Sequence, residues 1–411
     1  MKPKNIKNKN TKEKIYLDYA SSTPLDPRVL KVLTKVSANV YANPSALHVL
    51  GVEAHAYLDR ARKKVADTLG AHENEIIFCS GGTESDNIAI LGTVRAFKKK
   101  FPKIKPHIII SSIEHAAVLA GSDALSEEKV DVSVLPVNED GIVDPHVLRK
   151  LLRPETVLVS VMYANNEIGT IQSIREIAKE LRHYKKSKSL NQKNKKASVY
   201  PLFHTDASQA LNYLPVSVEK LGVDLLTINS SKIYGPKGVG ALYIKRNTPI
   251  APILFGGDQE YGLRPGTESL PSIVAFAEAV AIADALRDQE VLRLTAIRDV
   301  FIKKMKKTFP NIIVNGSLEF RLPNNINVSI PNYSSEMLVL YLDAEGIYVS
   351  AKSACKSIDP ESSHVIQAIR KKSKETEEGS IRFSMGRGTT AENMNYTLLS
   401  LKRILELLKK K

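Results

Sequence analysis

Short apolar runs alternate with longer helical segments along the first two thirds of the chain, and this alternation limits the folds it can adopt. Several runs are continuously apolar and β-branched, which is typical of strands covered on both faces. The predicted strands are Ile76–Cys79, His107–Ser111, Val157–Met162, Leu202–Thr205, Leu225–Ile228 and Ala241–Ile244. Helical segments between them include Glu84–Lys98, Pro145–Leu152 and Ser173–Tyr184. This order predicts an α/β fold with a mostly parallel sheet, in which ligands bind at the carboxyl ends of the strands.

The pattern changes after about residue 289, where a long helical segment precedes shorter elements. The expected elements are Glu290–Phe309, Asn325–Ile330, Ser335–Glu345, Ile347–Val349, Ile381–Ser384 and a final helix from Ala391. We therefore predict a large domain over residues 26–288 and a smaller α+β domain formed by residues 1–25 with 289–411, which a chain of 411 residues can accommodate. The Lys- and Asn-rich segment 184–198 is predicted to be a polar surface loop.

The net charge of +15 suggests at first an anionic partner such as a nucleic acid. The excess is local, however: residues 1–14 carry +5, residues 182–196 carry +7 and residues 402–411 carry +4, which leaves the rest of the chain near neutral. These segments lack interleaved aromatic residues and any RNA-binding motif, so we expect no direct nucleic-acid binding.

The two cysteines, Cys79 and Cys355, exclude a disulfide framework and a zinc site built on paired cysteines. Reduced thiols are typical of the cytoplasm, where we expect the protein to act. The first fourteen residues contain no apolar stretch of the secretory type, and no run of about 18 apolar residues occurs in the sequence. We therefore predict neither a secretory signal nor a membrane-spanning segment, and no metal site.

Three polar features follow directly after three predicted strands. Lys232 comes shortly after Leu225–Ile228, Asp206 follows Leu202–Thr205, and the run Ser80–Asn87 connects the strand Ile76–Cys79 to a helix through glycines. Free N–H groups at such a helix start suit a phosphate. A lysine that can form a Schiff base, a carboxylate that keeps a pyridine nitrogen protonated and a phosphate site together predict pyridoxal 5'-phosphate (PLP) as the cofactor.

With these residues in place, the sequence resembles the class V aminotransferase-like PLP enzymes of fold type I, and within them the group I (NifS/IscS-like) cysteine desulfurases. The resemblance covers nearly the whole chain. The matching motifs are Tyr16–Pro24, Asn43–His48, Gly82–Asn87, Glu114–Val118, Asn165–Gly169, Asp206–Gln209, Arg264–Thr267, Ser353–Ser357 and Arg382–Arg387.

The resemblance implies roles for residues around the cofactor ring. Lys232 is similar to the Schiff-base lysine that also carries protons, and Asp206 to the partner of the pyridine nitrogen. Gln209 would hydrogen-bond the phenolic oxygen, and Asn166 would contact the same region or the substrate. His115 resembles the ring stacked over the cofactor, where an imidazole can also move protons near neutral pH.

Further roles concern the phosphate and the substrate. Gly82 and Thr83 would hold the phosphate, and Thr267 is expected to reach the phosphate in a neighbouring subunit, which implies a homodimer. Arg382 resembles the arginine that binds the substrate α-carboxylate, for which a planar guanidinium is suited. Asn43 is expected to assist it.

Cys355 is the residue that distinguishes this reaction from others of the family. It lies between Lys352 and Lys356, and flanking cations favour the nucleophilic thiolate. The resemblance implies that L-cysteine becomes L-alanine while Cys355 takes up the sulfur as a persulfide. An acceptor protein, either an iron–sulfur scaffold or a tRNA-thiolation protein, would then receive it. Cys79 ends a strand where no thiol is needed, and we interpret it as structural.

Three positions depart from the family pattern. Ser231 stands where the family commonly has His, and Asn229 where Ser is usual; both family residues donate to the cofactor phosphate. Ser and Asn can still donate, so Asn229 and Ser231 are expected to bind the cofactor. Lys352 replaces a usual Gly, which removes easy access to positive φ near Cys355.

Other readings of the same residues remain open at this point. The chain could be another class V PLP enzyme, such as an aminotransferase or a selenocysteine lyase, for which Cys355 would be incidental. It could also be a weakly active sulfur-relay subunit, given Ser231 and Lys352. The choice between an iron–sulfur scaffold and a tRNA-thiolation protein as acceptor lies on the surface and not in these motifs.

Overall fold

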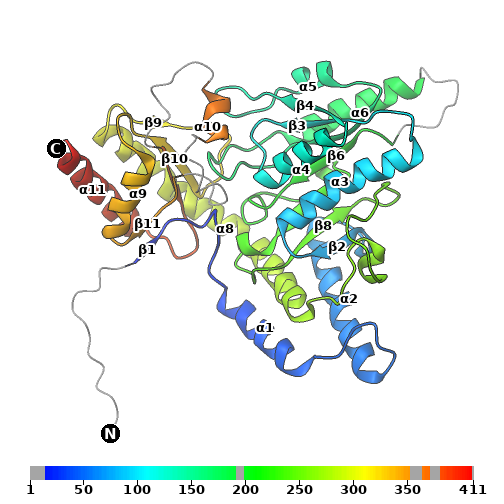
Figure 1. Cartoon of the computed structure of the whole chain (residues 1–411). Helices are drawn as coiled ribbons and strands as arrows, with labels where there is room; N and C mark the ends of the chain where they lie inside the picture. Colours follow the sequence, from blue (N-terminus) through cyan, green and yellow to red (C-terminus); the bar gives the residue numbers. More distant parts are fainter. Residues whose placement is uncertain (1–13, 191–198, 352–362, 371–379, 410–411) are drawn as a thin grey trace, which may run out of the picture.

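A computed structural model describes residues 14–190, 199–351, 363–370 and 380–409. Its centre is a seven-stranded sheet in the order β2-β8-β7-β6-β5-β3-β4 (Figure 1). The strands are β2 (Ile76–Cys79), β3 (His107–Ser111), β4 (Asp131–Leu135), β5 (Thr156–Ser160), β6 (Leu202–Asp206), β7 (Leu225–Asn229) and β8 (Gly240–Ile244). All pairs are parallel except those of β8, which runs antiparallel to both β2 and β7. The expected α/β fold with a mostly parallel sheet is confirmed.

All six strands expected in this region are present, and β4 is a seventh that was not expected. It lies at the edge of the sheet, and four of its five residues are partly or fully exposed. Because most of this strand is incompletely covered, its sequence does not need a continuous apolar run; β2, at the opposite edge, is fully buried and has one. The sequence DVSVL accordingly alternates apolar and polar residues.

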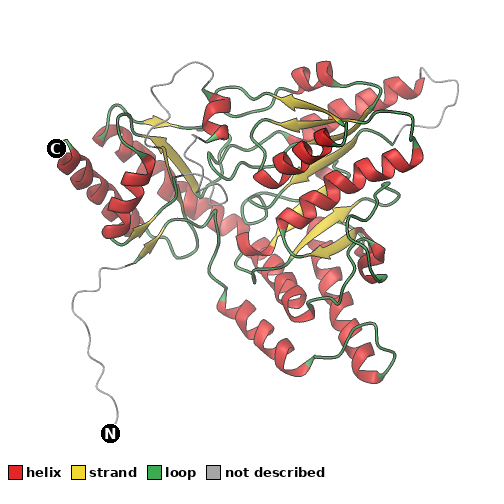
Figure 2. Cartoon of the chain, viewed as in Figure 1, coloured by secondary structure: helices red, strands yellow, loops and turns green. Residues whose placement is uncertain are grey.

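Helices cover both faces of the sheet (Figure 2). Side chains of α3 (Gly82–Lys100) and α4 (Ala116–Glu127) pack on one face in one hydrophobic core. The other face carries a larger core with residues from α1 (Pro27–Asn39), α2 (Val49–Leu69), α5 (Pro145–Leu151), α6 (Ile174–Leu190) and α7 (Val218–Leu221). Two covered faces explain why the inner strands are apolar at successive positions.

The loop expected over residues 184–198 begins later than predicted, since α6 continues to Leu190. Lysine is a good helix former, so a Lys-rich sequence can extend a helix although it looks like a solvated loop. Lys185 anchors the extension through an ion pair of 3.3 Å with Asp224. Residues 191–198 lie outside the described part of the chain.

A second group of elements packs beside the first, at the left of Figure 1. It contains a three-stranded antiparallel sheet, a short parallel pair and three helices, joined by the long helix α8. The elements are β1 (Ile15–Tyr16), α8 (Leu270–Thr308), β9 (Ile313–Val314), β10 (Asn325–Ser329), α9 (Ser335–Ala344), β11 (Ile347–Tyr348), α10 (His364–Ile369), β12 (Ser380–Ser384) and α11 (Ala391–Leu408).

Helix α8 takes part in two hydrophobic cores. Its residues from Leu270 to Ala283 pack in the core below the large sheet, and those from Leu294 to Met305 pack with β10, β12 and α11. The predicted boundary at residues 288–289 therefore falls inside one continuous helix. Ile15 and Leu17 join the second core, whereas Val365, Ile366 and Ile369 of α10 pack in the first. The division into two domains stays a prediction, and α10 would belong with the large one.

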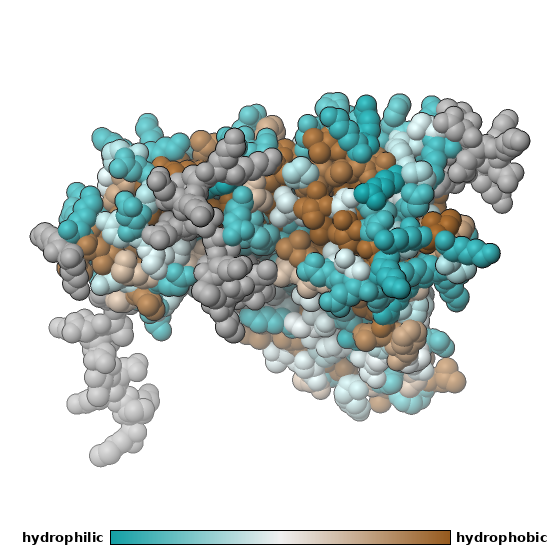
Figure 3. Space-filling view, turned by 45° about the horizontal axis from the view of Figure 1, so that its top comes forward, coloured by the Kyte–Doolittle hydropathy of each residue, from teal (hydrophilic) through white to brown (hydrophobic). Residues whose placement is uncertain are grey.

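The surface shown in Figure 3 mixes residue types, with hydrophobic residues near the middle of the view and hydrophilic ones toward its right-hand edge. Among the described helices, none has the length and apolar character that a membrane crossing requires.

Candidate active site

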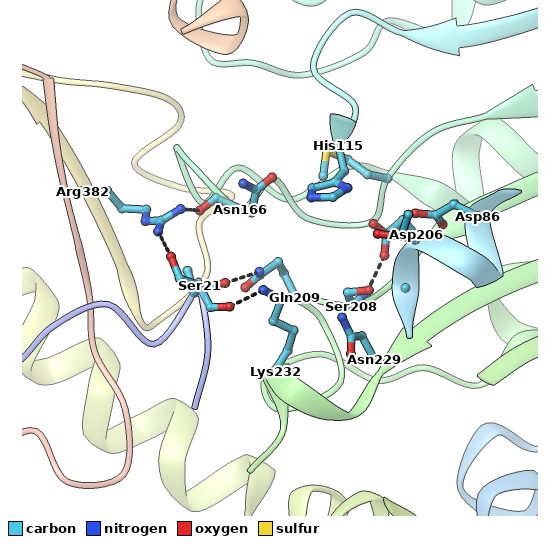
Figure 4. A pocket seen from close by; sticks show the side chains of 14 residues that line it. Ser21, Asp86, His115, Asn166, Asp206, Ser208, Gln209, Asn229, Lys232 and Arg382 are labelled. Carbon is cyan, nitrogen blue, oxygen red and sulfur yellow. Dashed lines mark hydrogen bonds between the residues drawn. The ribbon is translucent and has the colours of Figure 1, made fainter. Parts of the chain in front are cut away.

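A cavity of about 140 Å³ opens where the carboxyl ends of five strands meet the second group of elements (Figure 4). The strands β2, β3, β5, β6 and β7 each lead into a loop or helix that contributes to it, as expected at this edge of a parallel sheet. The lining residues are Ala20, Ser21, Gly82, Thr83, Asp86, His115, Met162, Asn166, Asp206, Ser208, Gln209, Asn229, Lys232 and Arg382. Nine of the residues predicted from the sequence thus come together in one cavity.

The N-terminus of α3 forms one wall of the cavity. Gly81 has φ 153°, a conformation that favours glycine, and Gly82 is the first residue of the helix. A Cβ atom at Gly82 would lie 3.3 Å from both the Asn229 Nδ2 atom and the Ser208 hydroxyl oxygen. The absence of that atom leaves a small space bordered by amide and hydroxyl donors at the positive end of a helix, which suits a phosphate group.

The amide of Asn229 has a fixed orientation. Its Oδ1 atom accepts hydrogen bonds from the backbone N–H and the hydroxyl of Ser231, each 3.2 Å long. Since Oδ1 is used in this way, Nδ2 is the end of the amide that borders Gly82. Ser231 itself is not among the residues that line the cavity, so its hydroxyl acts on Asn229.

Asp206 lies at the end of β6, where its Oδ1 atom accepts a hydrogen bond of 2.8 Å from the Ser208 N–H. A second carboxyl, Asp86, is 1% exposed and lines the same cavity. Burial, and after it the charge of Asp206, raises the pKa of Asp86 well above its usual value, which favours its neutral form. His204 lies behind this pair, with its Nε2 atom 3.6 Å from Asp86. Burial lowers the His204 pKa to about 4.

His115 lies at the start of α4 and caps this helix. Its Nδ1 atom accepts a hydrogen bond of 3.2 Å from the Ala117 N–H, so the neutral ring carries its proton on Nε2. The preceding residue, Glu114, is fully buried, and its Oε1 atom accepts hydrogen bonds from the Ser111 hydroxyl and the Met162 N–H. Burial raises the Glu114 pKa to about 8.

The segment after β1 crosses the cavity and contacts three of its residues. The Lys232 Nζ atom donates a hydrogen bond of 2.5 Å to the Ser21 carbonyl oxygen, and the Gln209 side-chain amide donates one of 2.9 Å to the Ala20 carbonyl oxygen. The Ser21 hydroxyl accepts a bond of 2.7 Å from Arg382 Nη2. One short segment therefore bridges the large sheet, which carries Lys232, and β12, which carries Arg382.

Comparison with known proteins identifies the family. The aminotransferase class-V family model matches residues 15–396. A protein of Dictyoglomus turgidum named cysteine desulfurase IscS is 44% identical over 97% of this chain and 96% of its own length. The solved structure of a NifS-like protein superimposes with a TM-score of 0.85 at 34% identity, covering 96% of this chain and 100% of the other. The chain belongs to the class-V aminotransferases and, within them, to the cysteine desulfurases.

A third similarity is to a protein whose structure contains bound cysteine. The structure titled SspA in complex with cysteine has a TM-score of 0.75 and 32% identity, and the match covers 91% of this chain and 99% of that one. That protein binds cysteine within the same fold. The enzymes of this family depend on PLP.

The cavity fits PLP by the chemistry of its donors. The space at Gly82, bordered by Ser208 and Asn229, suits the phosphate. Asp206 offers a carboxylate for the pyridine nitrogen, and Lys232 offers a primary amine for the aldehyde carbon. A phosphate site, a carboxylate and an amine in one cavity match the three functional ends of the cofactor.

Two predicted residues lie outside this cavity. Asn43 is exposed, and its Oδ1 atom accepts a hydrogen bond of 2.9 Å from the Ser45 N–H. Thr267 is exposed as well. Their neighbours Pro44 and Glu268 line one surface depression, so the two residues belong to the same surface. A single copy of the chain does not bring either residue to Arg382 or to the cradle at Gly82.

Cys355 and Lys352 lie outside the described residues. The described residues on either side of them, Ser350 and Ser363, are both held close to the cavity. The Ser350 N–H and carbonyl oxygen exchange hydrogen bonds with the backbone of Arg382. On the other side, the Ser363 hydroxyl donates a bond of 2.6 Å to Glu167. Ser350 thus pairs with Arg382, which lines the cavity, and Ser363 binds Glu167, which directly follows the lining residue Asn166. Cys79 is buried, and burial raises its pKa to about 12, which agrees with a structural role.

Asp18, Ser21 and Asp86 belong to the site although no role was predicted for them from the sequence. Asp18 and Ser21 belong to the motif Tyr16–Pro24, which contributed to the resemblance without receiving any role. The only signal was the position of a carboxylate and a hydroxyl within that motif. Asp86 lies one turn into a helix, where an acidic residue is ordinarily taken as solvent-facing.

Proposed function

We propose that this protein is a PLP-dependent cysteine desulfurase that converts L-cysteine to L-alanine and carries the sulfur on Cys355. The observation that supports this most directly is the presence of Lys232, Asp206, His115 and Arg382 in one cavity beside a phosphate cradle. When bound, PLP withdraws electrons from the substrate and so weakens the bonds at its α- and β-carbons.

The residues of the chain have separate tasks in this reaction. Lys232 holds and moves a proton at Nζ, and its bond to the Ser21 carbonyl fixes the amine in the cavity. His115 supplies a second proton-carrying group at Nε2. Arg382 binds the α-carboxylate, which leaves the thiol end of the substrate free to face another part of the cavity.

We assign sulfur transfer to Cys355. Its thiolate attacks the substrate sulfur while the Cβ–S bond breaks, and the electrons of that bond remain on carbon, which takes up a proton. The products are L-alanine and a persulfide on Cys355. Cys355 follows Ala351 by four positions, a reach of up to about 14 Å for an extended chain. Because Ser350 pairs with Arg382, this reach extends from the edge of the cavity.

We also propose that the protein forms a homodimer. Exposed apolar side chains gather around the connection of α1 and α2, at the lower edge of Figure 1, and on the loop before α8. They include Tyr41 at 79% exposure, Leu47 at 97%, Val49 at 81% and Phe255 at 83%. Apolar surface of this kind is typical of subunit interfaces. The same surface carries Asn43 and Thr267, which would reach the site of the other subunit.

The persulfide requires an acceptor protein, and we propose an iron–sulfur scaffold or a tRNA-thiolation protein. A relative that is 44% identical carries the name cysteine desulfurase IscS, which favours the scaffold. A reducing compartment such as the cytoplasm would keep the Cys355 thiol available for each turnover.

The proposal is tested with the purified protein. We expect a visible absorbance band from bound PLP and equal amounts of alanine and sulfide from L-cysteine with a reductant. Lys232→Ala should abolish alanine formation, and Cys355→Ser should abolish the enzyme-bound persulfide. A wild type that cannot be loaded with PLP would refute the enzyme assignment. If Cys355→Ser formed sulfide at the wild-type rate, the role of Cys355 as persulfide carrier would be wrong, while the assignment of PLP as the cofactor would stand.

A further inference from the structure

Arg382 is almost completely buried, and its guanidinium already has an acidic partner. Its relative exposure is 2%, and its Nη2 atom lies 2.7 Å from Asp18 Oδ1. Nη2 also donates a bond of 2.7 Å to the Ser21 hydroxyl oxygen, and that hydroxyl donates in turn to Asp18 Oδ1 at 2.9 Å. Both N–H groups of Nη2 are therefore in use (Figure 4 shows the contact with Ser21).

The other nitrogens of the guanidinium are less committed. Nη1 donates one bond of 3.1 Å to the Asn166 carbonyl oxygen. Nε is buried and has no hydrogen-bond partner among the described residues. A buried N–H group without a partner lowers stability, so Nε is available to an incoming hydrogen-bond acceptor.

A carboxylate binds arginine most strongly through two parallel N–H···O bonds, which need two neighbouring nitrogens. A guanidinium has two such pairs, Nε with Nη2 and Nη1 with Nη2, so both include Nη2. The N–H groups of Nη2 are occupied by Asp18 and Ser21. A substrate carboxylate that binds in this manner across Nη2 must displace one of them. Asp18 is able to move away, since its side chain is 20% exposed while that of Arg382 is 2% exposed.

We propose that Asp18 is an internal carboxylate that competes with the α-carboxylate of the substrate for Arg382, and so sets the affinity for the amino acid. This inference rests on the proposed function, in which Arg382 binds that carboxylate. Asp18 neutralises the buried guanidinium while the site is empty and lowers the affinity for any amino acid that replaces it. Because L-alanine keeps the carboxylate of L-cysteine, the same competition promotes release of the product.

The experiment measures binding without turnover. PLP-loaded wild type and Asp18→Asn are titrated with L-alanine, followed by the change in cofactor absorbance and independently by the shift in melting temperature. Removing a charged competitor should lower the dissociation constant of L-alanine about tenfold, in line with the strength of hydrogen bonds to charged groups. Cysteamine, which has the amine and thiol of cysteine but no carboxylate, should bind both proteins equally.

Two further variants complete the design. Ser21→Ala removes the other acceptor on Nη2 and should also tighten L-alanine binding, by a smaller factor; it keeps the inference testable if Asp18→Asn does not fold. Asp26→Asn is the matched control, because Asp26 pairs with Arg387 at 2.8 Å in the same N-terminal segment but outside the cavity. It should leave L-alanine binding unchanged.

The outcomes distinguish a wrong role for Asp18 from a wrong function for the protein. If Asp18→Asn and Ser21→Ala retain PLP but bind L-alanine as weakly as wild type or more weakly, Asp18 positions Arg382 and does not compete with the substrate. If wild type binds neither PLP nor L-alanine, the proposed function fails, and the inference fails with it.

Discussion

The hydroxyl of Ser231 donates to Oδ1 of Asn229 over 3.2 Å and thereby directs the amide nitrogen of Asn229 toward the cradle at Gly82. Both residues were expected to bind the cofactor. Asn229 borders the proposed phosphate site, and Ser231 fixes the orientation of the Asn229 amide, so the two residues act together.

We expect Asn229→Ala to raise the dissociation constant of PLP about tenfold, because one hydrogen bond to a charged phosphate is lost. Ser231→Ala should raise it by a smaller factor, since the backbone N–H of Ser231 still holds Oδ1. Equilibrium dialysis of the apoprotein against PLP gives both values.

Pyridoxal, which lacks the phosphate, provides the control for that measurement. Its affinity should be the same for wild type and both variants. Equal losses for PLP and pyridoxal would mean that the substitutions disturb the cavity as a whole, and the assignment of Asn229 to the phosphate would be wrong.

The exposed apolar surface predicts an oligomeric state that a single substitution can change. Leu47 is 97% exposed, and Leu47→Asp should convert the dimer into a monomer, because it places a charge in the proposed interface. Sedimentation velocity at micromolar concentration measures this directly. Leu407→Asp is the control, as Leu407 is 49% exposed on α11, in the other group of elements. A monomeric wild type would contradict the proposal.

The loop that carries this surface is held by a buried ion pair. Both Nη atoms of Arg62 lie 2.7 Å from the two carboxylate oxygens of Glu260, and the Phe78 N–H donates to the same carboxylate at 2.8 Å. The side chains are 8% and 1% exposed. We expect Glu260→Gln to lower the free energy of unfolding by about 3–5 kcal/mol, since it leaves a buried guanidinium without its charge partner.

Chemical denaturation measures that loss, and Asp67→Asn provides the comparison. Asp67 pairs with Lys63 at 3.1 Å, but both side chains are about 60% exposed. Removing an exposed pair should cost less than about 1 kcal/mol. Similar losses in the two variants would show that burial does not strengthen the Arg62–Glu260 pair.

The sequence was sufficient to predict the strands that are covered on both faces. Ile76–Cys79 and His107–Ser111 were predicted with the bounds that the structure shows, because burial on both sides requires an unbroken apolar run. β4 was missed because four of its five residues are partly or fully exposed and need no such run, and α6 was predicted too short because lysines are common in helices and in loops alike. In both cases the deciding contacts come from distant parts of the chain.

The candidate site was predictable to the extent that its residues follow strands. Lys232, Asp206 and Gly82 each come within about four residues of the end of a predicted strand, and strand ends converge at one edge of the sheet. Asp18 and Ser21 come from the N-terminal segment, which reaches Arg382 across 364 and 361 positions of sequence. No local pattern indicates which end of the chain will pack against the sheet.

The buried Glu114 predicts a specific dependence of stability on pH. Its pKa is about 8 in the folded protein, against 4.5 for the ordinary side chain. Between these values the folded state binds more protons than the unfolded state, so the contribution of Glu114 to stability is complete below pH 4.5 and is lost as the pH rises toward 8. The pKa of His204 is lowered to about 4, so its contribution to stability changes only below its ordinary value of 6.5. The pKa of Asp86 is raised as well, so a Glu114 variant is needed to isolate the contribution of Glu114 between pH 6.5 and 8.

We therefore expect the wild type to lose more unfolding free energy than Glu114→Gln between pH 6.5 and 8, by at most about 1.4 kcal/mol per pH unit. Glutamine keeps an oxygen that can accept from the Met162 N–H and has no charge to bury. Urea denaturation of both proteins at four pH values in this range gives the difference in slope. Parallel curves would show that the Glu114 carboxyl does not change its ionisation there, and that the cavity beside His115 tolerates a buried negative charge.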